Sequence, residues 1–382
     1  MSDSKRYRLG LIFNFNPKWM GGIIYLLNIS RILNFLEDDD KPKLFVFYPI
    51  ELKKFVDEID YPYVEKIAWK FPSVINGFIQ SKLKGRNVFV HDLIAQHNLD
   101  GVYPMHDYPV KSRQQCKQVS WYADLQHKYY PEFFTKRKRF ERDLRIKHIL
   151  NNSDDLVVSS QAVKNDFIKF YKIPRSLKIH IYHFVSIIDA LPKISPEDIK
   201  KKYGLPDEYF MISNQFHKHK NHKVALNALV MLKKEARPVH IAMTGSFPDQ
   251  PDSPYMQELH DIINENQLKS QISFLGLIPR GDQLLLMKNA KAILQPSLFE
   301  GWSTVIEDAR SLQVPVIATD LPVNIEQLGD KGKYFSAFDD EKLASLIIEQ
   351  QGIKKSKQLY EPYEKRMKDA AYSFYSIFNG KG

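Results

Sequence analysis

The sequence contains a single cysteine, Cys116, so no internal disulfide can form and nothing in the chain requires an oxidising compartment. Long apolar runs are missing as well. The least polar stretch, residues 19–30, contains two glycines and an asparagine and is too short to span a bilayer. The first apolar run, residues 9–15, includes Asn14 and lacks a small-residue cleavage site after it, which argues against a signal peptide. We therefore expect a cytoplasmic protein without a transmembrane helix.

Internal repeats and low-complexity tracts are also absent from the sequence. With 43% apolar and 26% charged residues the composition is that of a globular protein, and 382 residues suggest two domains at roughly 150 residues each. The 55 Lys and Arg exceed the 45 Asp and Glu, giving a net charge of +10. This excess favours anionic partners such as phosphates, nucleic acid or acidic lipid without choosing among them.

Short apolar strands alternate with helices in two series. The first series has expected strands at 9–15, 44–48, 87–90, 100–103, 118–122 and 155–159, and helices at 23–36 and 131–151. The second has strands at 209–213, 239–244, 272–275, 292–296 and 314–318, and helices at 223–235, 255–266, 283–289 and 303–311.

This alternation predicts an α/β protein with two Rossmann-like doubly wound domains, 1–186 and 187–355, followed by a helical segment, 356–382. Proline-rich residues 187–206 would connect the domains. Ligands bind at the carboxyl ends of parallel strands, so we expect the domains to face a central cleft lined by strand-to-helix loops.

The most informative loop follows the expected strand 292–296. There, Glu300 would project into the cleft, and a helix would begin with free amides that form an anion site. These amides belong to Ser303, Thr304 and Val305. Glu307 and Asp308 follow, placed to accept hydrogen bonds from a ribose-like diol. The alternative is that these acids merely stabilise the helix dipole.

Residues 299–309, Phe-Glu-Gly-Trp-Ser-Thr-Val-Ile-Glu-Asp-Ala, and 314–318, Val-Pro-Val-Ile-Ala, resemble the spaced-acid signature of retaining GT-B glycosyltransferases of family four, also called glycosyl transferases group 1. The resemblance covers nearly the whole chain. It implies an N-terminal acceptor-side domain, a C-terminal donor domain and a C-terminal helix, 356–382, that packs back on the N-terminal domain. It also implies that Glu300 binds the donor sugar, while Gly301 and the loop from Trp302 to Thr304 bind the diphosphate. The family's second acid, which binds the ribose, falls on Asp308 in place of Glu, and Glu307 one residue earlier stays an alternative.

The loop at 212–222 carries a second part of the resemblance. Lys220 matches a family lysine that binds the donor diphosphate. The family's arginine falls on Asn214 or Gln215, so part of the charge neutralisation would come from His217 or Lys218. Taken without the resemblance, this cluster is either a solvated loop or an incidental metal binder.

Three further segments are similar to family elements. Gly21 and Gly22, between the first strand and helix, would face the donor phosphates and the acceptor, and the absence of G-x-G-x-x-G argues against dinucleotide oxidoreduction. His127, in the segment that begins at Asp124, is implied to lie near the donor sugar, with Asp124 orienting the histidine or its loop. The resemblance also implies that Gly245 contacts the donor and that the backbone around Leu277 and Ile278 contacts the donor's base.

Two clusters of like charge lie outside these motifs. The acidic run Asp38–Asp40 is expected to be a solvated turn, and no metal or other cofactor is predicted. The helix beginning with Lys136, Arg137, Lys138 and Arg139 holds seven cations and two anions between residues 136 and 147. It is either a solvated face or a surface for anionic lipid or a lipid-diphosphate acceptor. No nucleic-acid motif accompanies it, so a nucleic-acid partner is not expected.

The resemblance implies a metal-independent hexosyltransferase that moves a sugar from a nucleotide-sugar donor to a glycan or lipid-linked acceptor with retention at the anomeric carbon. Its catalytic groups would be His127, Lys220 and Glu300. The expected setting is bacterial surface polysaccharide synthesis, with peripheral contact at the inner face of the plasma membrane. The alternatives are a hydrolysing nucleotide-sugar epimerase of the same architecture and a non-catalytic nucleotide-sugar-binding scaffold.

Overall fold

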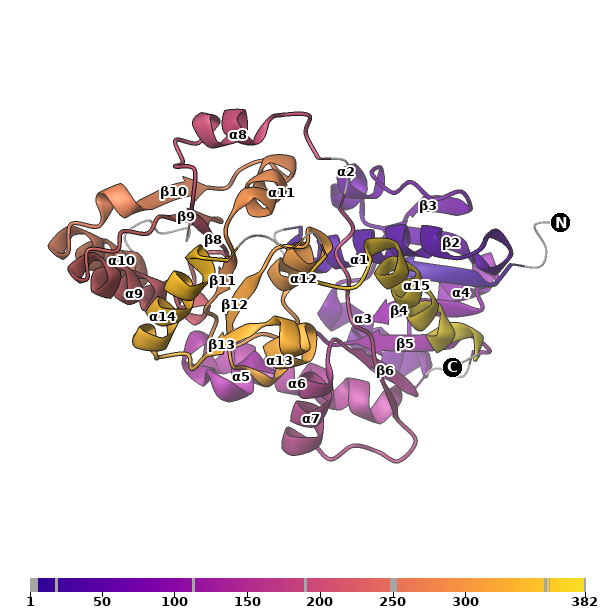
Figure 1. Cartoon of the computed structure of the whole chain (residues 1–382). Coiled ribbons are helices and arrows are strands. Elements are labelled where there is room, and N and C mark those ends of the chain that lie inside the picture. Colours follow the sequence, from indigo (N-terminus) through magenta and orange to yellow (C-terminus); the bar gives the residue numbers. More distant parts are fainter. Residues whose placement is uncertain are drawn as a thin grey trace. The chain divides into compact units, whose positions relative to one another are not determined.

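The computed structural model describes residues 6–17, 20–111, 114–188, 191–247, 253–353, 356 and 358–380. Figure 1 shows the elements along the chain. The chain divides into two compact units, of which the first comprises Met1–Val185 and Glu364–Gly382 and the second Ser186–Tyr363.

The first unit is built on a seven-stranded parallel sheet in the order β3-β2-β1-β4-β5-β6-β7. Its strands are β1 (Arg8–Ile12), β2 (Lys43–Tyr48), β3 (Val64–Ala68), β4 (Gly101–Met105), β5 (Lys117–Trp121), β6 (Asp155–Val158) and β7 (Lys178–Ile181). Its helices are α1 (Met20–Ile32), α2 (Lys53–Val56), α3 (Val74–Lys84), α4 (His91–His97), α5 (Gln126–Tyr129), α6 (Lys136–Asn152) and α7 (Gln161–Phe170). The central strands are buried nearly throughout, because helices cover both faces of such a sheet.

The second unit repeats this plan with six parallel strands in the order β10-β9-β8-β11-β12-β13. They are β8 (Phe210–Ser213), β9 (Ile241–Thr244), β10 (Ile272–Gly276), β11 (Ile293–Gln295), β12 (Val316–Thr319) and β13 (Lys333–Phe335). The helices are α8 (Pro196–Lys202), α9 (His222–Lys234), α10 (Pro254–Glu265), α11 (Arg280–Asn289), α12 (Thr304–Ser311), α13 (Pro322–Leu328) and α14 (Asp340–Gln351).

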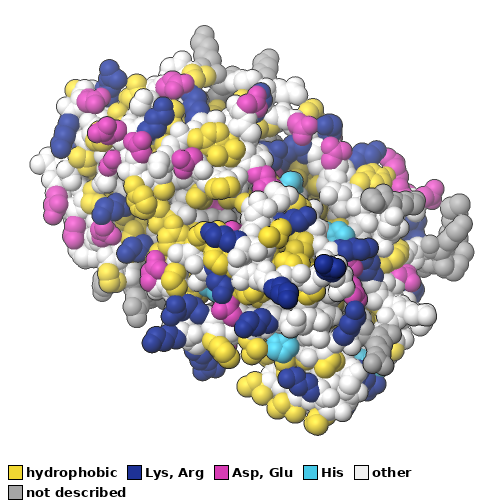
Figure 2. Space-filling model, turned by 90° about the horizontal axis from the view of Figure 1, so that it is seen from below, with side chains coloured by type: hydrophobic (Ala, Val, Ile, Leu, Met, Phe, Trp, Pro, Cys, Tyr) yellow, Lys and Arg dark blue, Asp and Glu magenta, His cyan; other side chains and the backbone are white. Residues whose placement is uncertain are grey.

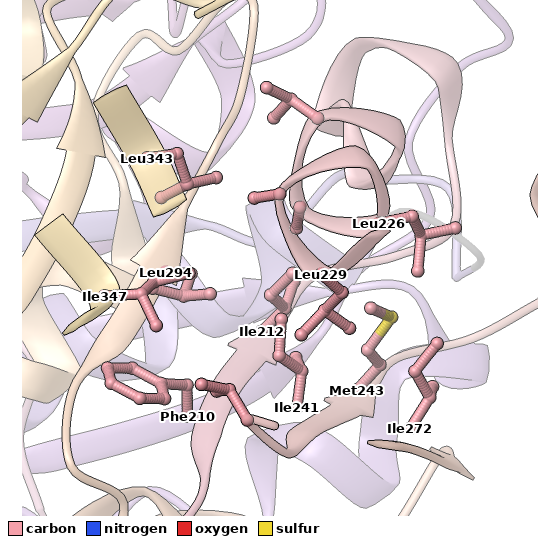
Figure 3. Close-up of a cluster of buried hydrophobic side chains, with 14 of the residues drawn as sticks. Phe210, Ile212, Leu226, Leu229, Ile241, Met243, Ile272, Leu294, Leu343 and Ile347 are labelled. Carbon is pink, nitrogen blue, oxygen red and sulfur yellow. The ribbon is translucent and has the colours of Figure 1, made fainter. Parts of the chain in front are cut away.

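One hydrophobic core of the second unit lies between the sheet and α9 (Figure 3). Leu226 and Leu229 of α9 pack with Met243 of β9, and Leu343 and Ile347 bring α14 into the same cluster. This packing fixes the position of α9, and with it the loop between β8 and α9.

Both sheets have the same switch of direction. The chain passes from the first strand outward to one edge, then returns to the other side of the first strand, so that β1 lies beside β4 and β8 beside β11. The loops after these neighbouring strands therefore start side by side at the carboxyl edge, which is the place where doubly wound sheets bind ligands. The predicted fold class, with two Rossmann-like sheets, is confirmed.

Two of the predicted elements are wrong. Residues 87–90 form a turn rather than a strand, because the Asn87 side chain accepts the Phe89 amide at 3.1 Å and its carbonyl accepts the Val90 amide at 3.3 Å. The helix expected at 131–151 is split into a 3₁₀ turn, Pro131–Phe133, and α6. Thr135 separates them, because its side chain caps α6 by accepting the Lys138 amide.

The last helix, α15 (Tyr363–Asn379), packs on the first unit, as the sequence predicted. The Tyr372 hydroxyl lies 3.1 Å from the Asp40 carboxylate, and Lys368 forms an ion pair with Glu37 at 2.6 Å. The Phe374 ring packs edge-on against Tyr103 of β4 with centroids 5.2 Å apart. Since Tyr103 is fully buried, α15 completes the core of that unit.

We expect Leu229→Ala to lower the free energy of unfolding of the second unit by about 2–5 kcal/mol, because the fully buried side chain leaves a cavity between α9 and the sheet. Chemical denaturation of the full chain measures this change. The control is Ile325→Ala on α13, whose side chain is 45% exposed, and it should change the free energy by about 0.5 kcal/mol or less. Equal effects of the two substitutions would contradict the core assignment.

Candidate functional site

Two loops of the second unit meet at the carboxyl edge of β8 and β11. The Lys220 ammonium, at the end of a 3₁₀ turn after β8, lies 2.6 Å from the Glu300 carboxylate in the loop after β11. A backbone hydrogen bond of 2.8 Å from the Leu298 amide to the His219 carbonyl ties the same loops together. The structure thus brings together two of the three predicted catalytic residues.

Two buried amide side chains, linked by hydrogen bonds, hold Glu300 in position. Asn214, directly after β8, donates its side-chain amide to Gln295 at the end of β11, at 3.0 Å. Gln295 in turn donates to the Glu300 carboxylate at 2.8 Å and to the Ser297 hydroxyl at 3.1 Å. Asn214 is therefore a structural link between strands, whereas Gln215 beside it is exposed. Gln295 was not among the predicted residues, because a glutamine that ends a buried strand belongs to no motif.

The electrostatics of Glu300 follow from these contacts. Burial alone raises the pKa of its carboxyl, but the attraction and hydrogen bond of Lys220, together with a hydrogen bond from Ser297, outweigh burial and lower the pKa below its usual value. Glu300 is therefore an anion at neutral pH, held beside a cation. Such a pair accepts hydroxyl groups at its carboxylate and attracts phosphate oxygens at its ammonium.

Helix α12 begins just beyond Glu300 and is capped by Ser303, whose hydroxyl accepts the Ile306 amide at 3.3 Å. The prediction that the Ser303 amide is free is wrong, because it donates to the Gln327 side chain at 2.9 Å. Gln327 of α13 also donates to the Ser303 carbonyl at 3.1 Å and so clamps the start of α12. The anion site at this helix start is therefore narrower than predicted and consists of the Thr304 and Val305 amides.

The two candidate ribose acids have different surroundings. Glu307 is fully buried and accepts hydrogen bonds from Gln327 at 3.0 Å and Arg310 at 2.8 Å. Asp308 accepts both guanidinium nitrogens of Arg280 at 2.5 and 2.7 Å, and the Ser186 hydroxyl as well. Arg280 is half exposed, whereas Arg310 is mostly covered. The arginine that pairs with Asp308 therefore reaches the surface, whereas Glu307 is buried among partners from α12 and α13. Asp308 is the more accessible of the two candidate acids through its partner.

Other predicted donor residues lie on neighbouring loops of the same edge. Gly245, after β9, has a φ of +151°, and a Cβ there would lie 2.1 Å from the Asn214 carbonyl oxygen, so the loops after β8 and β9 can approach only because this residue is glycine. Leu277 and Ile278 follow β10, with Leu277 exposed and Ile278 packed on the core. His217 and Lys218 are exposed on the Lys220 loop, and Gly301 and Trp302 lie between Glu300 and α12.

In the first unit, Gly21 and Gly22 lie in the first turn of α1, after β1. Gly22 is buried and Gly21 exposed. Lys18 and Trp19, which precede these glycines in the sequence, lie outside the described residues.

His127 of α5 is buried and both of its ring nitrogens have protein partners. Arg142 donates its Nε hydrogen to Nδ1 at 3.1 Å, and Nε2 lies 3.0 Å from the Asp143 carboxylate. Burial lowers the pKa of His127 despite Asp143, so the ring is neutral, and the network assigns its hydrogen to Nε2. Arg142 also donates to Asp124 at 2.9 Å, so the histidine and aspartate together fix this arginine. The predicted contact of His127 with a donor sugar stays a prediction.

The charge clusters lie on surfaces. Asp38 begins a short 3₁₀ turn and pairs with Arg6 at 2.9 Å. Lys136, Arg137, Lys138 and Arg139 form the first turn of α6, in which the first three are exposed and Arg139 is partly buried. Within the part of the chain that the structure describes, no helix is both long and apolar enough to cross a membrane.

Residues 195–372 match the model of the family described as glycosyl transferases group 1. The chain therefore carries a glycosyl transferases group 1 domain. It contains the loops of Lys220 and Glu300 and the whole of α12. The predicted resemblance is confirmed for the motifs in this segment, at residues 212–222 and 299–318.

Known proteins are similar to this chain at low identity. The O-antigen chain mannosyltransferase RfbU of Salmonella typhimurium is 24% identical over 226 residues, covering 59% of this chain and 58% of RfbU. The chain thus spans little more than half of that relative. The structure of HepE from Anabaena in complex with UDP matches with a TM-score of 0.63 at 18% identity, covering 97% of this chain and 95% of HepE. WaaG, a glycosyltransferase involved in lipopolysaccharide biosynthesis, matches with a TM-score of 0.60 at 14% identity, over 98% and 100%. These structures share the GT-B fold with this chain.

The buried pair in the group 1 domain predicts a pH-dependent stability. Because the pKa of Glu300 is lowered in the folded state, its stabilising contribution is complete above the usual carboxyl value of 4.5 and is lost as the pH falls through the folded pKa. We expect Glu300→Gln to cost about 3 kcal/mol at pH 7, and the difference from the unchanged protein to shrink as the pH falls below 4.5.

Denaturant unfolding at several pH values measures this difference. Glu258→Gln is the matched control, because Glu258 pairs with Lys223 at the surface, and it should cost about 1 kcal/mol or less. A Glu300→Gln cost that stays constant from pH 7 to pH 3 would contradict the ion-pair assignment.

Proposed function

We propose that this protein is a retaining, metal-independent glycosyltransferase that moves a hexosyl group from a nucleotide-sugar donor to a glycan or lipid-linked acceptor. The observation that carries the proposal is the contact between Lys220 and Glu300 at the switch point of the second sheet. This contact brings a carboxylate, a cation and the start of α12 together within two neighbouring loops, which supports one site for sugar hydroxyls and phosphate.

Each part of the donor then has a partner of matching chemistry. Glu300 accepts hydrogen bonds from hydroxyls of the donor sugar. Lys220 and the Thr304 and Val305 amides bind the diphosphate, since the positive end of a helix favours an anion. Asp308 accepts hydrogen bonds from the ribose hydroxyls, which displace the Arg280 guanidinium. Arg280 can move away because its side chain is half exposed. Leu277 and Ile278 lie where the base would be read.

In the proposed reaction the bond from the anomeric carbon to the diphosphate oxygen breaks and a bond from the acceptor oxygen to that carbon forms. The acceptor proton leaves with the nucleoside diphosphate. Negative charge grows on the departing oxygen, so Lys220 and the α12 amides stabilise the transition state more than the bound donor. In this scheme protein groups supply the positive charge that stabilises the departing diphosphate. His127 fixes Arg142 in the first unit, which we assign to the acceptor. Retention follows from the resemblance to family four.

The setting is also a proposal. RfbU is named as an O-antigen chain mannosyltransferase and WaaG as a lipopolysaccharide enzyme, which supports a role in bacterial surface polysaccharide synthesis. The HepE structure contains UDP, which supports a nucleotide donor for this chain. We place the protein in the cytoplasm, at the inner face of the plasma membrane where such acceptors are extended.

Lys220→Ala should weaken nucleoside diphosphate binding roughly 10- to 100-fold, because a charge-assisted contact to phosphate is lost. Glu300→Ala should lower transfer about 100-fold or more with the fold retained. Lys223→Ala is the matched control, since this neighbouring lysine pairs at the surface with Glu258, and it should leave binding and transfer unchanged. Calorimetry and release of nucleoside diphosphate in the presence of EDTA are the measurements.

A thermal-shift screen of nucleoside diphosphates and nucleotide sugars comes first, because a ligand of the native state raises its apparent stability. Unchanged binding and transfer in both site variants would contradict the assignment. Donor cleavage that needs no acceptor would favour an epimerase, and donor binding without turnover a scaffold.

A further inference from the structure

The first unit has a groove between α3 and α6 whose chemistry the proposed donor site does not explain. It encloses about 860 Å³, within the range that small-molecule sites occupy. One side consists of apolar residues of α3 and the other of a mixed face of α6, and Phe133 and Phe134 also line the groove. The Phe78 ring of α3 packs edge-on against His148 of α6, with centroids 5.1 Å apart, and joins the two helices.

The apolar side is unusually exposed. Ile75 is 74% and Ile79 54% exposed, and the two follow each other at helical spacing, so they lie on the same face of α3. Leu144 of α6 is also exposed and lines the same groove. A contiguous apolar surface of this kind, framed by charges, marks a binding site for an apolar group.

The opposite side supplies positive charge. Arg137, Lys138, Glu141 and Arg145 recur at helical spacing along α6 and line the groove, while Ile146, Ile149 and Leu150 face the core. Arg137 pairs with Glu141 at 2.7 Å, whereas Lys138 and Arg145 flank the apolar bed. Figure 2, seen from the side on which α6 and α7 lie in Figure 1, shows Lys and Arg side chains interspersed with hydrophobic ones. An anion attached to an apolar chain complements this combination.

The groove continues into a second hollow of about 650 Å³, because Val74, Asp107, Arg142 and Arg145 line both. The second hollow lies at the carboxyl edge of β1, β4 and β5 and is lined by Asn14, Asn16 and Trp121. Its polarity contrasts with the apolar bed on α3. One elongated molecule could fill both hollows if it had an apolar end for the groove on α3 and a hydroxyl-rich end for the polar hollow.

Asp107 marks where the polar end would lie. The residue is only 8% exposed. Its Oδ1 atom forms an ion pair with Arg145 at 3.3 Å but, among the described residues, has no partner in good hydrogen-bond geometry. Buried carboxylate oxygens are almost always hydrogen-bonded, so a donor from a ligand is the natural partner. Burial raises the pKa of Asp107, as expected for a carboxyl that lacks full solvation.

We propose that the groove between α3 and α6 binds the acceptor, and that this acceptor is an amphiphile with a sugar linked through phosphate to an apolar chain. The chain lies on Ile75 and Ile79, the phosphate lies at Lys138 and Arg145, and a sugar hydroxyl donates to Asp107. This inference rests on the proposed function for the fate of the sugar, but binding to the groove can be tested without a donor. A bilayer surface is the competing partner, and the joining of an apolar groove to a polar hollow through shared residues argues for a single molecule.

The probe is decyl phosphate below its micelle concentration, titrated into the full chain by calorimetry. We expect binding that Ile79→Asp weakens at least ten-fold, because a carboxylate enters the apolar bed beside a phosphate. The control is Ile168→Asp on α7, whose side chain is 58% exposed outside the groove, and it should change affinity less than two-fold. Lys138→Glu should weaken binding, whereas Lys147→Glu, on the same helix outside the groove, should not.

The polar end is tested with decyl glucosyl phosphate. It should bind more tightly than decyl phosphate, and Asp107→Asn should remove that gain while leaving decyl phosphate binding intact. Equal affinities of the Ile79→Asp and Ile168→Asp variants, or no binding to the unchanged protein, would overturn the proposal.

Phosphatidylglycerol vesicles distinguish the competing partner. If the Ile79→Asp variant still binds vesicles, and decyl phosphate shows no specific binding to the groove, the surface of α3 and α6 is a membrane-binding face and the proposal is overturned. The nucleotide thermal shift, measured on the same variants, should be unchanged. If no nucleotide binds to any protein while decyl phosphate does, the proposed function fails and the groove assignment stands.

Discussion

The ion pair between Lys220 and Glu300 is the contact on which the candidate donor site depends. Two loops that are 80 residues apart in sequence are brought together because β8 and β11 are neighbours in the sheet. Burying a carboxylate is costly unless a cation and hydrogen-bond donors surround it. Gln295 and Ser297 provide the donors, and Asn214 fixes the orientation of Gln295, so the sheet, the two amide side chains and the ion pair form one rigid platform.

Beyond the platform, α12 and its neighbours hold the second half of the site. Gln327 of α13 bonds to both backbone groups of Ser303 and to Glu307, which fixes the start of α12 relative to α13. Arg280 of α11 engages Asp308 from the other side. The helix start and the acid that we propose bind phosphate and ribose are thereby held in fixed positions on neighbouring helices, as precise positioning of a substrate requires.

Local pattern was sufficient for the doubly wound class, the main strands and the acids of the Glu300 loop, because apolar runs and the spaced-acid motif are written in contiguous sequence. It failed at Asn87, where a side chain bonds to its own turn and replaces a strand. It also missed the edge strands β3 and β7, which are less apolar since solvent reaches them. Gln295, Gln327 and Arg280 could not be found, because their roles arise from partners far away in the chain. The exposed isoleucines of α3 likewise acquire meaning only beside α6.

The most direct test of the central claim is a crystal structure of the full chain with the nucleoside diphosphate that stabilises it most. We predict diphosphate oxygens within hydrogen-bond distance of the Lys220 ammonium and the Thr304 and Val305 amides, with the ribose hydroxyls at Asp308 and Glu300 left facing the terminal phosphate. A nucleotide bound away from Lys220 and α12, with the Lys220 and Glu300 loops untouched, would contradict the claim that these two loops form the donor site.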